Sequence, residues 1–69
     1  MERFSVDSSN VESVGYDTDS ETLEVEFKNG TVYQYFDVPE RVFEELRGAS
    51  SVGSYLATQV KGVYRYSKV

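Results

Sequence analysis

The stretch that decides the fold is Leu23-Glu24-Val25-Glu26-Phe27-Lys28-Asn29-Gly30-Thr31-Val32-Tyr33-Gln34-Tyr35-Phe36. Its first half alternates apolar and charged residues, which is the period-two pattern of a strand with one buried face. Asn29-Gly30 is a typical hairpin turn, and the second half is rich in the aromatic and β-branched residues that favour strands. The segment therefore predicts an antiparallel β-hairpin.

Two registers are open to this hairpin. A two-residue turn pairs Val25 with Gln34 and directs the Gln34 amide into the core. A three-residue turn with Gly30 in a left-handed conformation pairs Val25 with Tyr33 instead and places Tyr35 on the same face. Burying an unpaired amide costs about 1–3 kcal/mol. We therefore expect the three-residue turn.

Weaker strand signals precede the hairpin. Residues 11–16 predict a strand, and the polar run 17–20 predicts the turn that follows it. Phe4 and Val6 alternate with polar residues near the start of the chain. They indicate either a short edge strand or an anchored arm.

Two helix signals and a strand signal follow the hairpin. Pro39 suits the first turn of a helix that Gly48 would end. Ser50 or Ser51 can cap a second helix running to about residue 61, and Gly53 within it indicates close packing or a frayed start. Residues 63–69 alternate again. The sequence thus predicts one α+β domain, residues 1–69, of order β-β-β-α-α-β: an antiparallel meander of about three strands, two short helices and a C-terminal strand.

Composition narrows the possible chemistry. The 69 residues include no Cys and no His, so disulfides are excluded and a structural zinc site is not expected. Nucleophilic hydroxyls lack an imidazole base. Glu24 and Glu26 fall on the solvated face of their strand, and Asp17 and Asp19 lack the spacing of a calcium loop. We expect no enzymatic activity, no cofactor and no metal.

The chain carries no apolar run of membrane-spanning length, and its start does not resemble a signal peptide. We expect a soluble, cytoplasmic protein. Charge is unevenly placed: residues 1–46 hold all 12 acidic residues and three basic ones, a net −9, whereas residues 47–69 hold four basic residues and no acid. Such asymmetry indicates either a charged contact surface or two segments that lie side by side and neutralise each other.

The C-terminal third combines basic and aromatic residues. Aromatic side chains interleaved with cations are typical of proteins that bind single-stranded nucleic acid. The alternative is a terminal strand whose tyrosines pack on the sheet. The helix start at residues 50–53 lacks a P-loop pattern, and capping explains its serines better than phosphate binding does. The nucleic-acid-binding candidates are Arg47, Tyr55, Lys61, Arg65, Tyr66 and Lys68.

An ordered set of short motifs runs along the chain, within a match that extends from about residue 8 to 66: Ser9-Asn10-Val11, Val14-Gly15-Tyr16-Asp17, Leu23-x-Val25-x-Phe27, Gly30, Tyr33-x-Tyr35, Val38-Pro39 and Ala49-Ser50-Ser51-x-Gly53-x-Tyr55. This set resembles the KTSC domain, a family named for a C-terminal extension of some lysyl-tRNA synthetases that also occurs as short stand-alone proteins. The resemblance implies a small domain of unknown function for which RNA binding has been suggested, with no catalytic residue and no cofactor.

The family motif maps onto four residues of this chain: Tyr33, Tyr35, Gly53 and Tyr55. The chain departs from the family where a Lys commonly precedes that glycine and a Phe follows that tyrosine, since Val52 and Leu56 stand there. Loss of the lysine weakens a phosphate-binding interpretation of the helix start.

Two functions from different classes follow. The first is a non-catalytic module that binds RNA or tRNA. The second is a protein–protein interaction module, with self-association as one form of it, because the three-residue turn leaves Val32 and Phe36 on the sheet face opposite the predicted core. A third possibility is that Phe4 and Val6 cover that second face. The sequence does not determine the oligomeric state.

Overall fold

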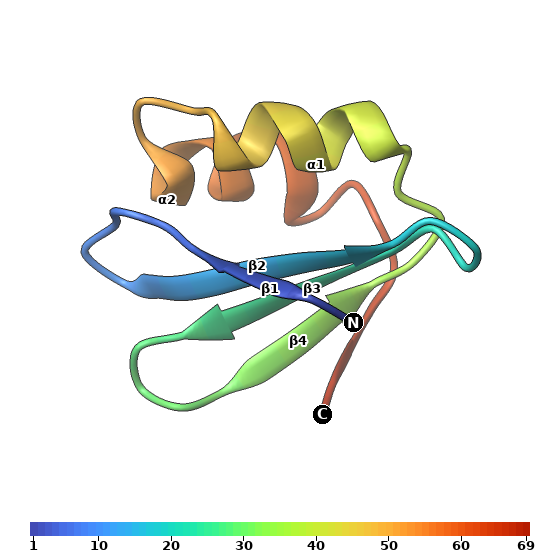
Figure 1. The fold of residues 1–69 in the computed structure, drawn as a ribbon, viewed down its shortest axis with the longest axis horizontal. Coiled ribbons are helices and arrows are strands. Elements are labelled where there is room, and N and C mark those ends of the chain that lie inside the picture. The colour runs from blue at the N-terminus through green and yellow to red at the C-terminus, as the bar shows by residue number, and fades with distance from the viewer.

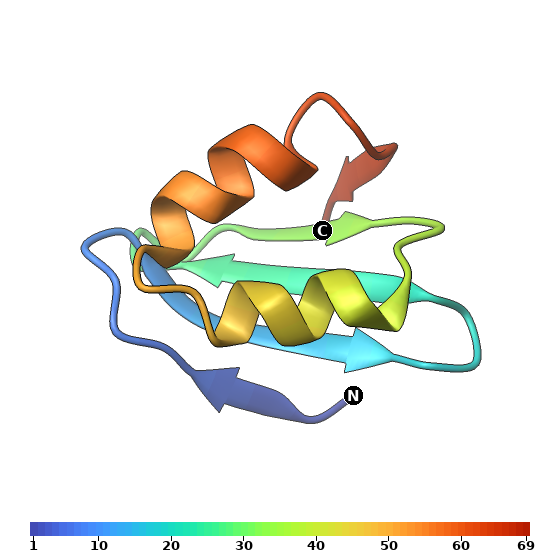
Figure 2. The same ribbon diagram turned by 90° about the horizontal axis from the view of Figure 1, so that it is seen from above.

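The computed structural model describes residues 1–69. Five antiparallel strands form one sheet in the order β1-β2-β3-β4-β5, and both helical segments lie over one of its faces (Figure 1). Seen from above, α1 lies along β2 and β3, and the second helix runs obliquely across the β4 side (Figure 2). The bounds are β1 Arg3–Ser5, β2 Val11–Asp17, β3 Thr22–Phe27, β4 Val32–Tyr35, α1 Glu40–Arg47, α2 Val52–Tyr55, η1 Leu56–Val60 and β5 Tyr66–Lys68.

The fold is α+β as predicted, but four strands precede the helices rather than three. The additional strand is β1, which pairs antiparallel with β2 and places Phe4 opposite Val14. Phe4 and Val6 pack against the core beneath the helices, and the Phe4 ring centroid lies 6.1 Å from that of Phe43. The third possibility, that these two side chains cover the opposite face, is therefore excluded, because pairing with β2 directs them toward the helices.

The predicted hairpin register is confirmed. Val25 pairs with Tyr33, and Leu23 pairs with Tyr35. The Phe27 N–H donates to the Thr31 carbonyl at 2.8 Å, which closes a three-residue turn. Gly30 has φ +92°, a conformation that glycine adopts without steric cost.

A bulge in β2 increases the number of apolar side chains that the sheet can bury. Val11 pairs with Phe27, but Ser13 already pairs with Glu26, so Glu12 has no partner on β3. One extra residue shifts the alternation of the strand by one position. Val11 and Val14, three residues apart, are consequently both fully buried.

Helix α1 follows the prediction. Pro39 precedes it, Gly48 ends it, and Val42, Phe43 and Leu46 are its buried side chains. The second helix begins where expected, with the Ser51 hydroxyl accepting a hydrogen bond from the Ser54 N–H at 3.3 Å.

The second helix does not stay regular. Its last turn is a π-helix, in which the Lys61 N–H donates to the Leu56 carbonyl at 2.9 Å. Gly62 follows with φ +79°. The last strand covers only residues 66–68, not 63–69, because this turn and the segment after it carry the chain from the helix layer back to the edge of β4.

The core contains 12 apolar residues contributed by the sheet and both helical segments. The opposite sheet face is polar: the Arg3 guanidinium bonds to Glu24 at 2.6 Å and to Glu26 at 3.0 Å, and the Gln34 amide donates to Glu24 at 2.8 Å. Neither helical segment has the length and apolar character needed to cross a bilayer. The aromatic side chains of β3 and β4 lie on the other face, the one that carries the helices.

Candidate functional site

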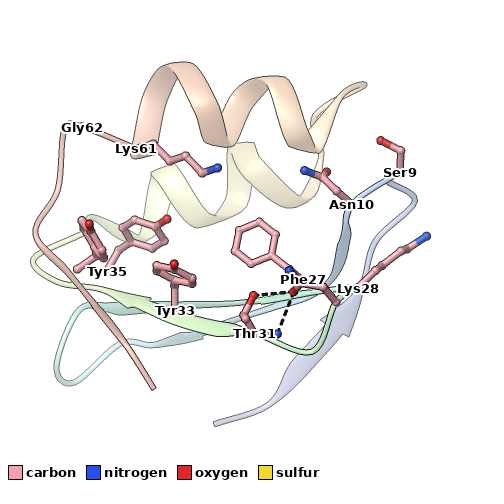
Figure 3. A pocket seen from close by; sticks show the side chains of 11 residues that line it. Ser9, Asn10, Phe27, Lys28, Thr31, Tyr33, Tyr35, Lys61 and Gly62 are labelled. Carbon is pink, nitrogen blue, oxygen red and sulfur yellow. Dashed lines mark hydrogen bonds between the residues drawn. The ribbon is translucent and has the colours of Figure 1, made fainter.

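A groove of about 760 Å³ lies between the end of the second helix and the β3–β4 side of the sheet. It exists because the helices cover only part of the apolar sheet face, which leaves aromatic side chains at its margin partly open. Figure 3 shows Phe27, Tyr33 and Tyr35 rising from the strands and Lys61 reaching over them from the helix end. The volume of the groove falls within the range of about 300–1,000 Å³ found for small-ligand sites.

Four aromatic rings form the floor of this groove, which we call the aromatic groove. Phe27 meets Tyr33 edge-on with ring centroids 5.8 Å apart. Tyr66 lies 5.7 Å from Tyr33 and 6.0 Å from Tyr35 by the same measure. Tyr35 is 3% exposed and Tyr66 is 62% exposed. Exposure of the floor therefore increases from the buried Tyr35 ring to the open Tyr66 ring on the edge strand β5.

Strand pairing positions these rings. Tyr33 and Tyr35 alternate with Gln34 on β4 and therefore share one face. Tyr66 is the register partner of Tyr35 on β5, and neighbours that pair directly across two strands have their side chains side by side. The cross-strand arrangement therefore produces a contiguous aromatic surface from residues more than 30 positions apart in the sequence.

Two lysines and no acidic residue line the aromatic groove. The Lys61 ammonium lies 5.4 Å from the centroid of the Phe27 ring, within cation–π range. The π-helical turn and Gly62 direct the chain at this point, so Lys61 sits at the helix end that faces the sheet. Lys28 lies in the hairpin turn. The groove is thus locally cationic in a chain of net charge −5.

Polar side chains form the remaining wall. The Asn10 carbonyl accepts a hydrogen bond from the Lys28 N–H at 2.9 Å, which ties the start of β2 to the hairpin turn. The Asn29 carboxamide oxygen accepts bonds from the Thr31 hydroxyl at 2.7 Å and from the Thr31 N–H at 3.0 Å. These bonds hold the rim of the groove in place.

The three tyrosines of the floor add hydroxyl groups to its ring faces. Burial, together with neighbouring Tyr33 and Tyr66, raises the pKa of the Tyr35 hydroxyl. A protonated phenol can donate one hydrogen bond and accept another. No group of three or more Asp, Glu, Cys or His side chains lies together in a way that could hold a metal ion. The site therefore offers ring faces, amides, hydroxyls and ammonium groups.

The structure brings together only part of the predicted nucleic-acid-binding set. Lys61 and Tyr66 line the aromatic groove, as do Tyr33 and Tyr35 of the family motif. Lys68 lies on β5 without lining the groove. Of the four basic residues in the C-terminal third, only Lys61 lines the groove.

Three other candidates are engaged elsewhere. The Arg47 guanidinium stacks 3.9 Å above the Phe4 ring at the β1 side of the molecule. The Arg65 guanidinium pairs with Asp37 at 2.7 Å, which is the local neutralisation that the sequence left open. The Tyr55 hydroxyl donates to Glu45 at 2.7 Å, and this bond raises the pKa of Tyr55 to about 12.

Several groove residues were not among the sequence candidates. The alternation of Phe27 with Glu24 and Glu26 predicts a core side chain, and Lys28 falls in the predicted turn. The hairpin register contains the signal: when Val25 pairs with Tyr33, Phe27 lies beyond the last residue pair between β3 and β4. Asn10 belongs to the Ser9-Asn10-Val11 motif of the family resemblance, but its place in the groove depends on contact with the hairpin turn, which the sequence does not indicate.

Comparison with known proteins identifies relatives across almost the whole chain. The profile of the KTSC domain matches residues 7–64. A lysine–tRNA ligase of Trichormus variabilis is 43% identical over 54 residues, which is 78% of this chain and 10% of the ligase. An uncharacterized protein of Stutzerimonas stutzeri is 39% identical over 70 residues, covering 100% of this chain and 99% of that protein.

A solved structure agrees with these relatives. The crystal structure of a KTSC domain protein from Yersinia pestis is 38% identical, with a TM-score of 0.92 over 99% of this chain and 96% of that one. The chain spans about a tenth of the length of the lysine–tRNA ligases that it matches, and almost the full length of the small uncharacterized relative.

Proposed function

This chain belongs to the KTSC domain family, and from that premise we propose that it is a non-catalytic RNA-binding module, acting on single-stranded RNA or tRNA in the cytoplasm. The ligand's unpaired bases stack in the aromatic groove. The observation that carries the proposal is the combination of four aromatic rings and two lysines in one hollow without an acidic residue.

Each component of the groove matches a part of a nucleotide. Bases stack on aromatic side chains with about 1–3 kcal/mol per base, largely regardless of sequence. Lysines neutralise phosphates, and side-chain amides and hydroxyls bond the polar edges of unpaired bases. A double helix offers no free ring face to such a floor, so the proposed ligand is unpaired RNA.

The relatives support an RNA partner. The matching segments of three relatives lie in lysine–tRNA ligases, proteins whose name states that they act with tRNA. Because the match covers only a tenth of each ligase, ligase activity does not transfer to this chain. What transfers to the proposal is association with RNA.

Charge sets the expected form of binding. The chain has net charge −5 and an isoelectric point of about 4.5, so its overall field repels a polyanion. Lys28 and Lys61 are the only two cations in the groove. With about 0.7 counterions released per phosphate contact on a single strand, log K should fall against log salt with a slope of about −1.4. A larger slope would require phosphate contacts outside the groove.

A binding assay with a matched substitution tests the proposal. We expect an unstructured 12-nucleotide RNA to bind at low salt, and Lys61→Gln to weaken it about tenfold. Arg41→Gln removes the same charge from an exposed helix position outside the groove, and we expect it to leave binding within about twofold. Absence of binding by both the 12-mer and tRNA at low salt contradicts the proposal, as does an equal effect of the two substitutions.

A protein-interaction module is the second candidate, because no helix covers the outer face of the sheet (Figure 1). Val32 and Phe36 are half-exposed there. The same face carries the Arg3–Glu24–Glu26 network, and the Arg65 guanidinium lies 5.7 Å from the centroid of the Phe36 ring, so the apolar area is interrupted by charge. Sedimentation equilibrium tests self-association: a monomer at high concentration opposes it.

A further inference from the structure

A second hollow of about 530 Å³ adjoins the aromatic groove. The two share Ser9, Asn10 and Lys61 in their linings, so they meet along that boundary. The second hollow contains no aromatic ring. Ser50, Ser51 and Ser54 contribute hydroxyl groups to it, and we call it the serine hollow.

The glycine of the second helix keeps the two hollows adjacent. A Cβ atom at Gly53 would lie 3.2 Å from the Asn10 Oδ1 and 3.9 Å from the Ser8 Oγ. Glycine therefore lets the turn at the start of β2 approach the helix closely. The Ser8 hydroxyl accepts a bond from the Val11 N–H at 3.2 Å, which fixes this turn. The close approach at Gly53 and the hydrogen bond of Ser8 therefore position the boundary between the two hollows.

Lys61 is the only cation that lines both hollows. On the aromatic side its ammonium lies 5.4 Å from the Phe27 centroid. No salt bridge involves it, so its charge is available to a ligand. A single cation at the junction of an aromatic hollow and a hydroxyl-lined hollow matches the order of groups along a nucleic-acid strand: base, phosphate and next sugar.

We propose that the two hollows together bind one single-stranded dinucleotide step. One base stacks on the aromatic floor, the phosphate that links it to the next nucleotide meets Lys61, and the next ribose enters the serine hollow. This inference rests on the proposed function and deepens it, because it states the minimal ligand. Asp7 also lines the serine hollow. Its carboxylate and the serine hydroxyls suit ribose hydroxyl groups, whereas a second base would find no ring there on which to stack.

A length series of small ligands tests the inference. The full chain is titrated at low salt with adenosine, the dinucleotide ApA and hexa-adenylate, followed by NMR chemical shifts. A charge-assisted phosphate contact should make ApA bind about tenfold or more tightly than adenosine. Equal binding of adenosine and ApA would overturn the dinucleotide site.

Two glutamate substitutions with the same charge locate the effect. Ala57 is exposed and lines the serine hollow, whereas Gln59 is exposed and lines neither hollow. Ala57→Glu should remove most of the advantage of ApA while leaving adenosine binding unchanged, and Gln59→Glu should preserve that advantage. An Ala57→Glu variant that binds ApA as the parent chain does would refute the inference.

The two proposals fail in different ways. If hexa-adenylate binds but adenosine and ApA bind equally, RNA binding stands and the dinucleotide step falls. If no ligand in the series binds, the RNA-binding proposal itself falls, and the dinucleotide step with it.

Discussion

Replacing Tyr66 tests the aromatic groove most directly. Its ring is 62% exposed on an edge strand and lies 5.7 and 6.0 Å from the Tyr33 and Tyr35 centroids. Tyr66→Ala removes the most open ring face of the floor. Loss of one stacking contact is worth about 1–3 kcal/mol, which corresponds to an increase in Kd of about 5- to 150-fold for single-stranded RNA.

The assay must separate loss of stacking from loss of folding. Two aromatic pairs at about 0.5–1.5 kcal/mol each also stabilise β5, so urea unfolding is measured for each variant and binding is compared only where the chain is folded. Tyr66→Phe keeps the ring and should bind RNA within about twofold of the parent chain. Fluorescence anisotropy with a labelled 12-mer gives the Kd.

Two outcomes would refute the reasoning about Tyr66. A folded Tyr66→Ala variant with unchanged affinity means that RNA does not stack on this floor. A Tyr66→Phe variant as weak as Tyr66→Ala means that the hydroxyl, rather than the ring face, makes the contact.

Three further predictions concern the scaffold. Gly15→Ala should lower the free energy of unfolding by about 1–3 kcal/mol in urea, because its Cβ would lie 2.7 Å from the Glu2 carbonyl oxygen. Gly48→Ala, whose Cβ would have its nearest atom 3.4 Å away, should cost little. Equal stability of the two variants contradicts the predicted clash at Gly15. Gly30→Ala should cost about 1–2 kcal/mol, because its φ is +92°, and a smaller loss in the same measurement means that the turn relaxes. Although burial opposes the shift, hydrogen bonds from Gln34 and Arg3 lower the pKa of Glu24. The ionised Glu24 therefore stabilises the folded chain fully above its unfolded-state pKa, and this stabilisation is lost as pH falls through the lower folded-state pKa. In urea unfolding below about pH 4, Glu24→Gln should lose less stability on acidification than the parent chain does.

The hairpin was predictable because its information is local. Alternation assigns the faces of Leu23 and Val25, Gly30 supplies the left-handed turn residue, and the cost of burying the Gln34 amide selects the register. Each of these depends on residues within one short segment. The helix bounded by Pro39 and Gly48 is predictable for the same reason, since its start and end signals lie within it.

The N-terminal strand and the C-terminal contacts were harder to predict because they depend on distant residues. Three residues of β1 carry too little pattern to choose between an edge strand and an anchored arm, and only pairing with β2 decides between them. Arg65 resembled a free cation in sequence, but its partner Asp37 lies 28 positions earlier. The π-helical last turn that positions Lys61 likewise has no residue pattern that distinguishes it from an α-helical end.

The same alternation that builds the core also explains how an acidic chain can present a cationic groove. On β3, period two directs Phe27 toward the helices and places Glu24 and Glu26 on the outer face, where Arg3 binds both carboxylates. The acids of this strand are therefore separated from the groove by the thickness of the sheet and are partly neutralised there. Lys61 meets no such counter-charge on the groove side. Because the overall field still repels a polyanion, the proposed RNA affinity must come from short-range stacking and one or two phosphate contacts, which is why removing a single ring or a single lysine should have a measurable effect.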